Sequence, residues 1–162
     1  MRVVANEKAD AVEAVAIRPK PKVRAALQAW GLNVMLVDDD AADASLIIGL
    51  LQRHPSVGAA NVYHEPDRAL ADIAAGWRQP DLILLDINMP KTNGFAFIAA
   101  LAKMEHARTI PVVFLTTSNF ARDVEQARLA QACGYIVKPE SFDDLRRRLD
   151  AAVKQTISGK WS

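Results

Sequence analysis

Short apolar segments alternate with amphipathic segments along most of the chain. The clearest is the Leu-Ile-Leu-Leu run at 82–85, which is apolar at every position and ends at Asp86. Such a run is typical of a strand that is buried on both faces of a parallel sheet. On the same basis we predict five strands, at residues 32–37, 61–64, 82–85, 110–115 and 135–137.

Apolar residues between these strands recur at spacings of three and four, as on one face of a helix. Asp43, Pro66 and Ser141 are well placed to cap or begin helices. The apolar faces are predicted to include Leu46, Ile47, Leu50, Leu51, Ala69, Leu70, Ile73, Phe95, Ile98, Leu101, Ala102, Val124, Ala127, Leu129, Phe142, Leu145, Leu149 and Val153. Alternating strands and helices predict an α/β, doubly wound parallel sheet with right-handed crossovers and helices on both faces.

Residues 1–31 differ from the rest, with six Lys or Arg against three Asp or Glu. Pro19 and Pro21 interrupt any continuous helix there, and residues 23–30 then form a short amphipathic helix with Gly31 as its C-cap. We consider three roles for this N-terminal extension. It could cover its own domain, dock on a second subunit, or bind nucleic acid, although no interleaved aromatic residues support the last.

Composition indicates one globular domain. The 162 residues are 51% hydrophobic and 24% charged, with a net charge of +1, which argues against DNA or membrane partners. The single cysteine, Cys133, excludes an intrachain disulfide. No signal peptide or membrane span is evident, so a cytoplasmic location is expected. His54, His64 and His106 follow no metal-ligand spacing and are expected on the surface.

Polar residues follow four of the predicted strands: Asp38 and Asp39, Asp86, Thr116, and Lys138. Each alone is compatible with an ordinary turn. A parallel sheet brings all four strand ends to one edge, however, where α/β proteins bind ligands. Crowded carboxylates repel one another unless a divalent cation is bound, and oxygen-only ligands favour Mg²⁺.

Together these residues suit phosphoryl transfer to a carboxylate. Asp86 would act as the nucleophile, and Lys138 and the Thr116 hydroxyl would stabilise the phosphoryl oxygens. Without metal, Asp38 and Asp39 should titrate as a coupled pair.

The order and spacing of the site motifs resemble those of the receiver domain of two-component response regulators. These motifs are Val37-Asp38-Asp39, Asp86 with Met89-Pro90 and Gly94, Thr116, and Lys138-Pro139. The resemblance covers residues 32–155 and implies a flavodoxin-like (βα)5 fold. It leaves 1–31 as an N-terminal extension and 156–162 as a C-terminal tail. The segments at 111–118 and 133–139 are similar to those of single-domain receivers that serve phytochrome kinases.

The resemblance implies a role for each site residue. Asp86 matches the phosphoacceptor, Asp39 the direct Mg²⁺ ligand, and Asp38 its acidic partner that acts through water. Asn88 lies where the family supplies a backbone carbonyl to the metal. Thr116 and Tyr135 match the switch residues, and Lys138 the family's lysine. The bond between Lys138 and Pro139 is expected to be cis, as in the family.

Two departures from the family pattern stand out. The loop at 91–93 reads Lys-Thr-Asn, where Asp before the glycine is common. Thr117 is larger than the residue usual at its position, so we expect it to hinder an attacking water and slow dephosphorylation.

Only residues 156–162 follow the last predicted helix, which leaves no room for an output domain. We therefore expect a single-domain regulator, not an enzyme, that accepts a phosphoryl group from a sensor histidine kinase or a histidine phosphotransfer protein. Phosphorylation would draw Thr116 toward Asp86, let Tyr135 rotate inward and reshape the face of the fourth helix, fifth strand and fifth helix. That face often forms receiver homodimers, and the mixed charges at 143–148 suit such pairing or a solvated helix face.

Two alternatives come from other classes. A haloacid-dehalogenase-type phosphatase would use a similar site, but residues 38–42 lack the final Thr or Val of its motif, and no cap domain fits. A receiver that acts as a constitutive dimerisation or scaffold protein would show no dependence on phosphorylation.

Overall fold

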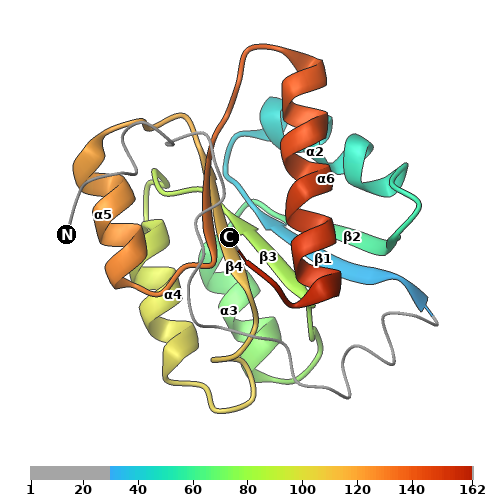
Figure 1. The fold of residues 1–162 in the computed structure, drawn as a ribbon. Helices are drawn as coiled ribbons and strands as arrows, with labels where there is room; N and C mark the ends of the chain where they lie inside the picture. The colour runs from blue at the N-terminus through green and yellow to red at the C-terminus, as the bar shows by residue number, and fades with distance from the viewer. Residues whose placement is uncertain (1–29, 162) are drawn as a thin grey trace.

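The structure, a computed structural model, describes residues 30–161 (Figure 1). One sheet holds five strands, all parallel, in the order β2-β1-β3-β4-β5. The strands are β1 (Leu32–Val37), β2 (Val57–Tyr63), β3 (Leu82–Leu85), β4 (Val112–Thr116) and β5 (Gly134–Val137). This order confirms the predicted doubly wound sheet.

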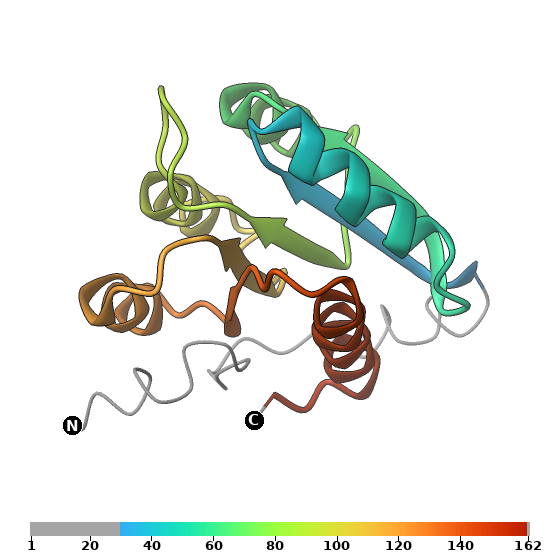
Figure 2. The same cartoon turned by 90° about the horizontal axis from the view of Figure 1, so that it is seen from above.

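Helices cover both faces of the sheet (Figures 1 and 2). They are α2 (Ala41–Gln52), α3 (Pro66–Ala74), α4 (Gly94–Ala102), α5 (Ala121–Leu129) and α6 (Phe142–Ser158). The buried residues of α2 and α6 pack on one face, and those of α3, α4 and α5 pack on the other. Among the helices described, none is both long and apolar enough to cross a membrane.

The central strands are apolar throughout because both of their faces are buried. Along β3, Leu82 and Leu84 belong to the layer under α2 and α6, whereas Ile83 and Leu85 belong to the opposite layer. Successive side chains of a strand point to opposite faces, so a strand between two helical layers needs apolar residues at every position.

The second strand begins earlier than predicted. It starts at Val57 rather than at residue 61 and therefore includes Gly58. A Cβ at Gly58 would lie 1.9 Å from the Trp30 carbonyl oxygen. Glycine within a strand often marks such a close approach of two backbones, so here Gly58 permits strand pairing instead of ending it.

The cap of α2 also differs from the prediction. Asp40, not Asp43, is the N-cap, and its carboxylate accepts a hydrogen bond of 2.9 Å from the Asp43 backbone N–H. The predicted cap of α6 is confirmed, because the Ser141 hydroxyl accepts from the Asp144 N–H. That helix continues to Ser158.

Four side chains that were assigned to apolar helix faces are exposed: Leu46, Ala102, Leu129 and Phe142. In α2 the buried positions are Ala44, Ile47 and Leu51, and Leu46 lies just outside that stripe. Leu129 and Phe142 are terminal residues of their helices, where contact with the sheet ends. The predicted helix at 23–30 falls outside the described residues, apart from Trp30.

His54 is not the surface residue that the sequence suggested. Its Nε2 lies 2.8 Å from Asp150 Oδ1, and its side chain is 14% exposed. The contact joins the end of α2 to α6, two helices that the topology places on the same face of the sheet. His64 is exposed, as expected.

Candidate functional site

Backbone hydrogen bonds between neighbouring strands fix the positions of the predicted site residues. The Asp86 N–H donates to the carbonyl of the last residue of β1 (3.0 Å), and the Lys138 N–H donates to the Thr116 carbonyl (2.7 Å). Each residue directly after a strand is therefore held by the adjacent strand. The sheet brings these residues to its carboxyl edge, as the sequence predicted.

Three carboxylates meet at this edge. Oxygen atoms of Asp38, Asp39 and Asp86 all lie within 4.8 Å of one another. Asp38 and Asp86 are buried, whereas Asp39 is exposed. Among residues 30–161, Asp86 Oδ1 is buried and has no hydrogen-bond partner. A buried orphan oxygen beside two other carboxylates fits a hard divalent cation such as Mg²⁺, which prefers oxygen ligands.

Burial raises the pKa of Asp86 above its ordinary value. The charge of Lys138 opposes this shift, as do hydrogen bonds from the Thr116 side chain and from the Asn88 backbone. The charge of Asp38 adds to the shift. Asp86 as a whole is 8% exposed. It is accessible at the sheet edge but poorly solvated, which favours a reaction or a ligand that reduces its charge.

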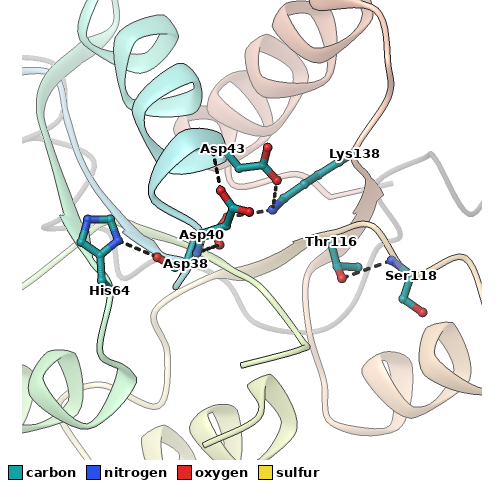
Figure 3. Close-up of polar contacts among 7 residues, drawn as sticks. All are labelled: Asp38, Asp40, Asp43, His64, Thr116, Ser118 and Lys138. Carbon is teal, nitrogen blue, oxygen red and sulfur yellow. Dashed lines mark hydrogen bonds and ion pairs between the residues drawn. The ribbon is translucent and has the colours of Figure 1, made fainter. Parts of the chain in front are cut away.

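Lys138 is directed toward the first strand and α2 (Figure 3). Its Nζ lies 2.7 Å from Asp38 Oδ2 and 3.0 Å from Asp43 Oδ2. Burial lowers the pKa of Lys138, but the hydrogen bond and charge of Asp38, helped by Asp86 and Asp43, outweigh it and raise the pKa overall. The amine is thus a fixed positive charge at the site.

Thr116 and Tyr135 are connected through the backbone of Ser118. The Ser118 N–H donates to Thr116 Oγ1 (3.3 Å; Figure 3), and the Tyr135 hydroxyl donates to the Ser118 carbonyl (2.8 Å). Tyr135 is buried beside Phe114, with ring centroids 6.2 Å apart, and burial raises its pKa to about 12. The sequence suggested inward rotation on phosphorylation. The ring already lies inward, because this hydrogen bond and the aromatic contact hold it there.

The remaining predictions concern loop residues. Asn88 and Thr117 are both exposed at the site. The predicted cis bond before Pro139 is wrong, because no cis peptide bond occurs in the described part of the chain. The trans form of an X-Pro bond is favoured by about 0.5–1 kcal/mol unless the surroundings select cis.

Two residues at the site were missed in the sequence. Asp43 contacts Lys138, although the sequence suggested only a helix cap. His64 Nδ1 lies 2.9 Å from the Asp38 carbonyl oxygen, so this nitrogen carries the proton and donates it. Asp43 was detectable as an acid in the first turn after the Asp38 strand end. No local signal pointed to His64, because its contact depends on the pairing of β1 with β2.

The sequence profile of the response regulator receiver domain matches residues 34–150. This chain belongs to the response regulator receiver family. Among curated relatives, the chain is 32% identical over 121 residues to the probable methanogenesis regulatory protein FilR2 of Methanothrix harundinacea (strain 6Ac), covering 72% of this chain and 78% of FilR2.

Solved structures of receiver proteins have the same fold. The phosphorylated cyanobacterial phytochrome response regulator RcpA aligns with a TM-score of 0.72 and 27% identity, covering 79% of this chain and 95% of RcpA. The Mn²⁺-bound response regulator Rcp1 aligns with a TM-score of 0.67 and 27% identity, covering 74% and 90%. The predicted similarity to phytochrome-associated receivers is confirmed by these structures.

Other relatives are longer than the matched region. The chain is 29% identical to the DNA-binding dual master transcriptional regulator RpaA of Synechocystis sp. (strain ATCC 27184 / PCC 6803 / Kazusa) over 124 residues, which are 76% of this chain but 50% of RpaA. It spans 29% of a protein-glutamate methylesterase of Pseudomonas savastanoi. The shared part is the receiver domain.

Proposed function

We propose that this receiver accepts a phosphoryl group on Asp86 from a phosphohistidine of a sensor kinase or phosphotransfer protein, and signals by binding a protein partner. The observation that carries the proposal is the buried Asp86 carboxylate. Its Oδ1 has no partner among the described residues, and it lies beside Asp38 and Asp39 at the carboxyl edge of the sheet.

The reaction is a displacement at phosphorus. A carboxylate oxygen of Asp86 forms the new P–O bond as the P–N bond to the donor imidazole breaks, and the bonding electron pair stays on the imidazole nitrogen. The product is an aspartyl phosphate. Asp86 must be ionised to attack, and the charge of Lys138 favours that form against the effect of burial, which raises the pKa of Asp86.

Asp38, Asp39, Asp86 and the Asn88 backbone carbonyl are the residues that would hold Mg²⁺. When bound, the cation supplies positive charge to a phosphoryl oxygen and relieves repulsion among the carboxylates. The related response regulator Rcp1 was solved in its Mn²⁺-bound form, which supports a divalent cation in this family.

Lys138 and Thr116 are the residues placed to stabilise the phosphoryl oxygens. Lys138 is a buried cation at the end of β5, and Thr116 is fully buried at the end of β4. Preorganised charges and hydrogen-bond donors that face developing negative charge are a major source of rate enhancement in phosphoryl transfer. The Thr116 side chain already hydrogen-bonds Asp86 and accepts from the Ser118 N–H, so a phosphoryl group on Asp86 would act on the loop after β4 through this hydroxyl.

The output surface is the face of α5, β5 and α6. On α6, Arg146 pairs with Asp143 and Arg147 pairs with Asp144, so both signs of charge are present on one exposed surface. Such a surface suits pairing with a second copy of the chain, and a phosphorylation-dependent homodimer is our proposed output. Its cytoplasmic location remains a prediction.

A second candidate function is a constitutive binding module. The inward position of Tyr135, whose hydroxyl donates to the Ser118 carbonyl, favours it. In that case the output face would have its binding conformation at all times, and the protein would bind its partner irrespective of phosphorylation.

Size-exclusion chromatography with light scattering separates the two functions. Wild type and Asp86→Asn are compared with and without Mg²⁺ and beryllofluoride, which stands in for a phosphoryl group on the aspartate. We expect a change in mass or elution with wild type only. A dimer of equal amount in every condition would support the constitutive module.

A further inference from the structure

Lys138 is held by a carboxylate that the family roles do not use. We infer that Asp43 is a positioning residue that keeps the Lys138 amine on the α2 side of the site and weakens its contact with a phosphoryl group on Asp86. This inference rests on the proposed function, because it concerns the same site. Lys138 Nζ lies 3.0 Å from Asp43 Oδ2, as Figure 3 shows.

The first turn of α2 fixes where Asp43 lies. The Asp40 carboxylate caps the helix by accepting from the Asp43 N–H (2.9 Å), and the Asp40 N–H donates to Asp38 Oδ1 (2.9 Å). These two hydrogen bonds tie the backbone of Asp43 to the strand end that carries Asp38. A carboxylate in the first turn is also favoured by the helix dipole. The backbone of Asp43 is therefore held in place without Lys138.

Lys138 forms two ion pairs within residues 30–161. They are formed with Asp38 and Asp43, and none is formed with Asp86. An ammonium group has three N–H donors, and these two carboxylates take two of them. One donor is left for a phosphoryl group on Asp86, which would have to draw the amine away from the two carboxylates that hold it.

The two contacts of Lys138 differ in how easily they open. Asp38 is fully buried, and removing the partner of a buried charge is costly. The Asp43 side chain is 43% exposed, so water can solvate it when the amine leaves. Partly exposed ion pairs are weak. The Asp43 contact is thus the one that opens. Because Asp43 competes for the amine, the affinity of the site for a phosphoryl group is lowered by a small factor.

Affinity for beryllofluoride tests this role. Isothermal titration calorimetry on the full chain with saturating Mg²⁺ compares wild type with Asp43→Asn and with Asp40→Ser. The control removes the same charge from the same turn without touching Lys138, and serine keeps the N-cap. We expect Asp43→Asn to bind about two- to five-fold more tightly than Asp40→Ser, the factor that a partly exposed ion pair supplies. Asp43→Glu, which keeps the carboxylate, should return the affinity to that of wild type.

A metal-free readout isolates the contact itself. The ¹⁵Nζ resonance of the Lys138 amine should shift in Asp43→Asn and stay unchanged in Asp40→Ser. A general structural effect on α2 would not produce this difference between the two variants. Equal affinities of Asp43→Asn and Asp40→Ser, or no restoration by Asp43→Glu, would overturn the role of Asp43. The proposed function would still stand if wild type binds beryllofluoride and Asp86→Asn does not. Failure of wild type to bind beryllofluoride would refute both.

Discussion

Lys138 Nζ lies 2.7 Å from Asp38 Oδ2, although the two residues are 100 positions apart in the chain. Asp38 follows β1 and Lys138 follows β5, and the strand order places β3 and β4 between them. The ion pair therefore spans the strand ends that carry Asp86 and Thr116. This contact joins the two outer strand ends of the site.

Removing the cation of this pair should destabilise the fold. Lys138→Met leaves the fully buried Asp38 without a counter-charge, which should cost about 3 kcal/mol in the free energy of unfolding without divalent cations. Added Mg²⁺ should restore part of the loss, because it supplies positive charge to the same carboxylate. Urea denaturation measures both effects. The double variant Asp38→Asn/Lys138→Met is the control and should be more stable than Lys138→Met, and a single variant as stable as wild type would contradict the account.

The Asp86 carboxylate should itself be a source of instability at neutral pH. Burial raises the pKa of Asp86, so the folded state favours the protonated form. The stability that this group contributes is complete below its unfolded pKa of about 3.9 and is lost as pH rises through the raised folded pKa. Asp86→Asn should therefore unfold at a higher temperature than wild type at pH 7 without metal.

The pH dependence separates this effect from a general one. The difference in melting temperature between wild type and Asp86→Asn should shrink as the pH falls toward 4, where the carboxyl group is increasingly protonated in both the folded and unfolded states. A difference that stays constant from pH 4 to 7 would show that ionisation of Asp86 is not its cause.

The start of α4 should tolerate no side chain at Gly94. A Cβ there would lie 2.6 Å from the Asp86 carbonyl oxygen and 2.7 Å from a ring carbon of Phe114. Gly94→Ala should therefore cost about 1–3 kcal/mol of stability, as overpacked sites do. Gly49→Ala is the matched control, because nothing lies within 4 Å of its Cβ, and alanine should raise the stability of α2 by up to about 1 kcal/mol. Equal effects of the two changes on the melting temperature would refute the steric argument.

Thr117 should prolong the phosphorylated state. It is exposed and directly follows Thr116, where its side chain can obstruct a water that approaches the phosphoryl group. Thr117→Ala should shorten the lifetime of the aspartyl phosphate by several-fold, measured as loss of label after removal of the donor. An unchanged lifetime would count against this role, and Asn119→Ala, a change at another exposed residue of the same loop, controls for general loop effects.

Much of the fold could be predicted because burial leaves a direct trace in the sequence. The run at 82–85 is apolar at each position since both faces of β3 are covered. The start of β2 could not be predicted, because Gly58 resembles a loop residue unless the neighbouring Trp30 backbone is known. Leu46 was assigned inward because the register of a helix is ambiguous by one residue when apolar side chains are adjacent.

The site was predictable at the level of strand ends but not of contacts. Parallel strands bring Asp38, Asp86 and Lys138 to one edge whatever the side chains do. Which carboxylates pair with Lys138 depends on the first turn of α2, whose cap is Asp40 rather than Asp43. The position of Tyr135 depends on a loop carbonyl that no sequence pattern specifies.

The most direct test of the central claim is intact-mass spectrometry of the full chain after incubation with Mg²⁺ and phosphoramidate, a small donor with the same P–N bond as phosphohistidine. The account predicts that wild type gains the mass of one phosphoryl group and that Asp86→Asn gains none. An unmodified wild type, or the same gain in Asp86→Asn, would contradict the assignment of Asp86 as the phosphoacceptor.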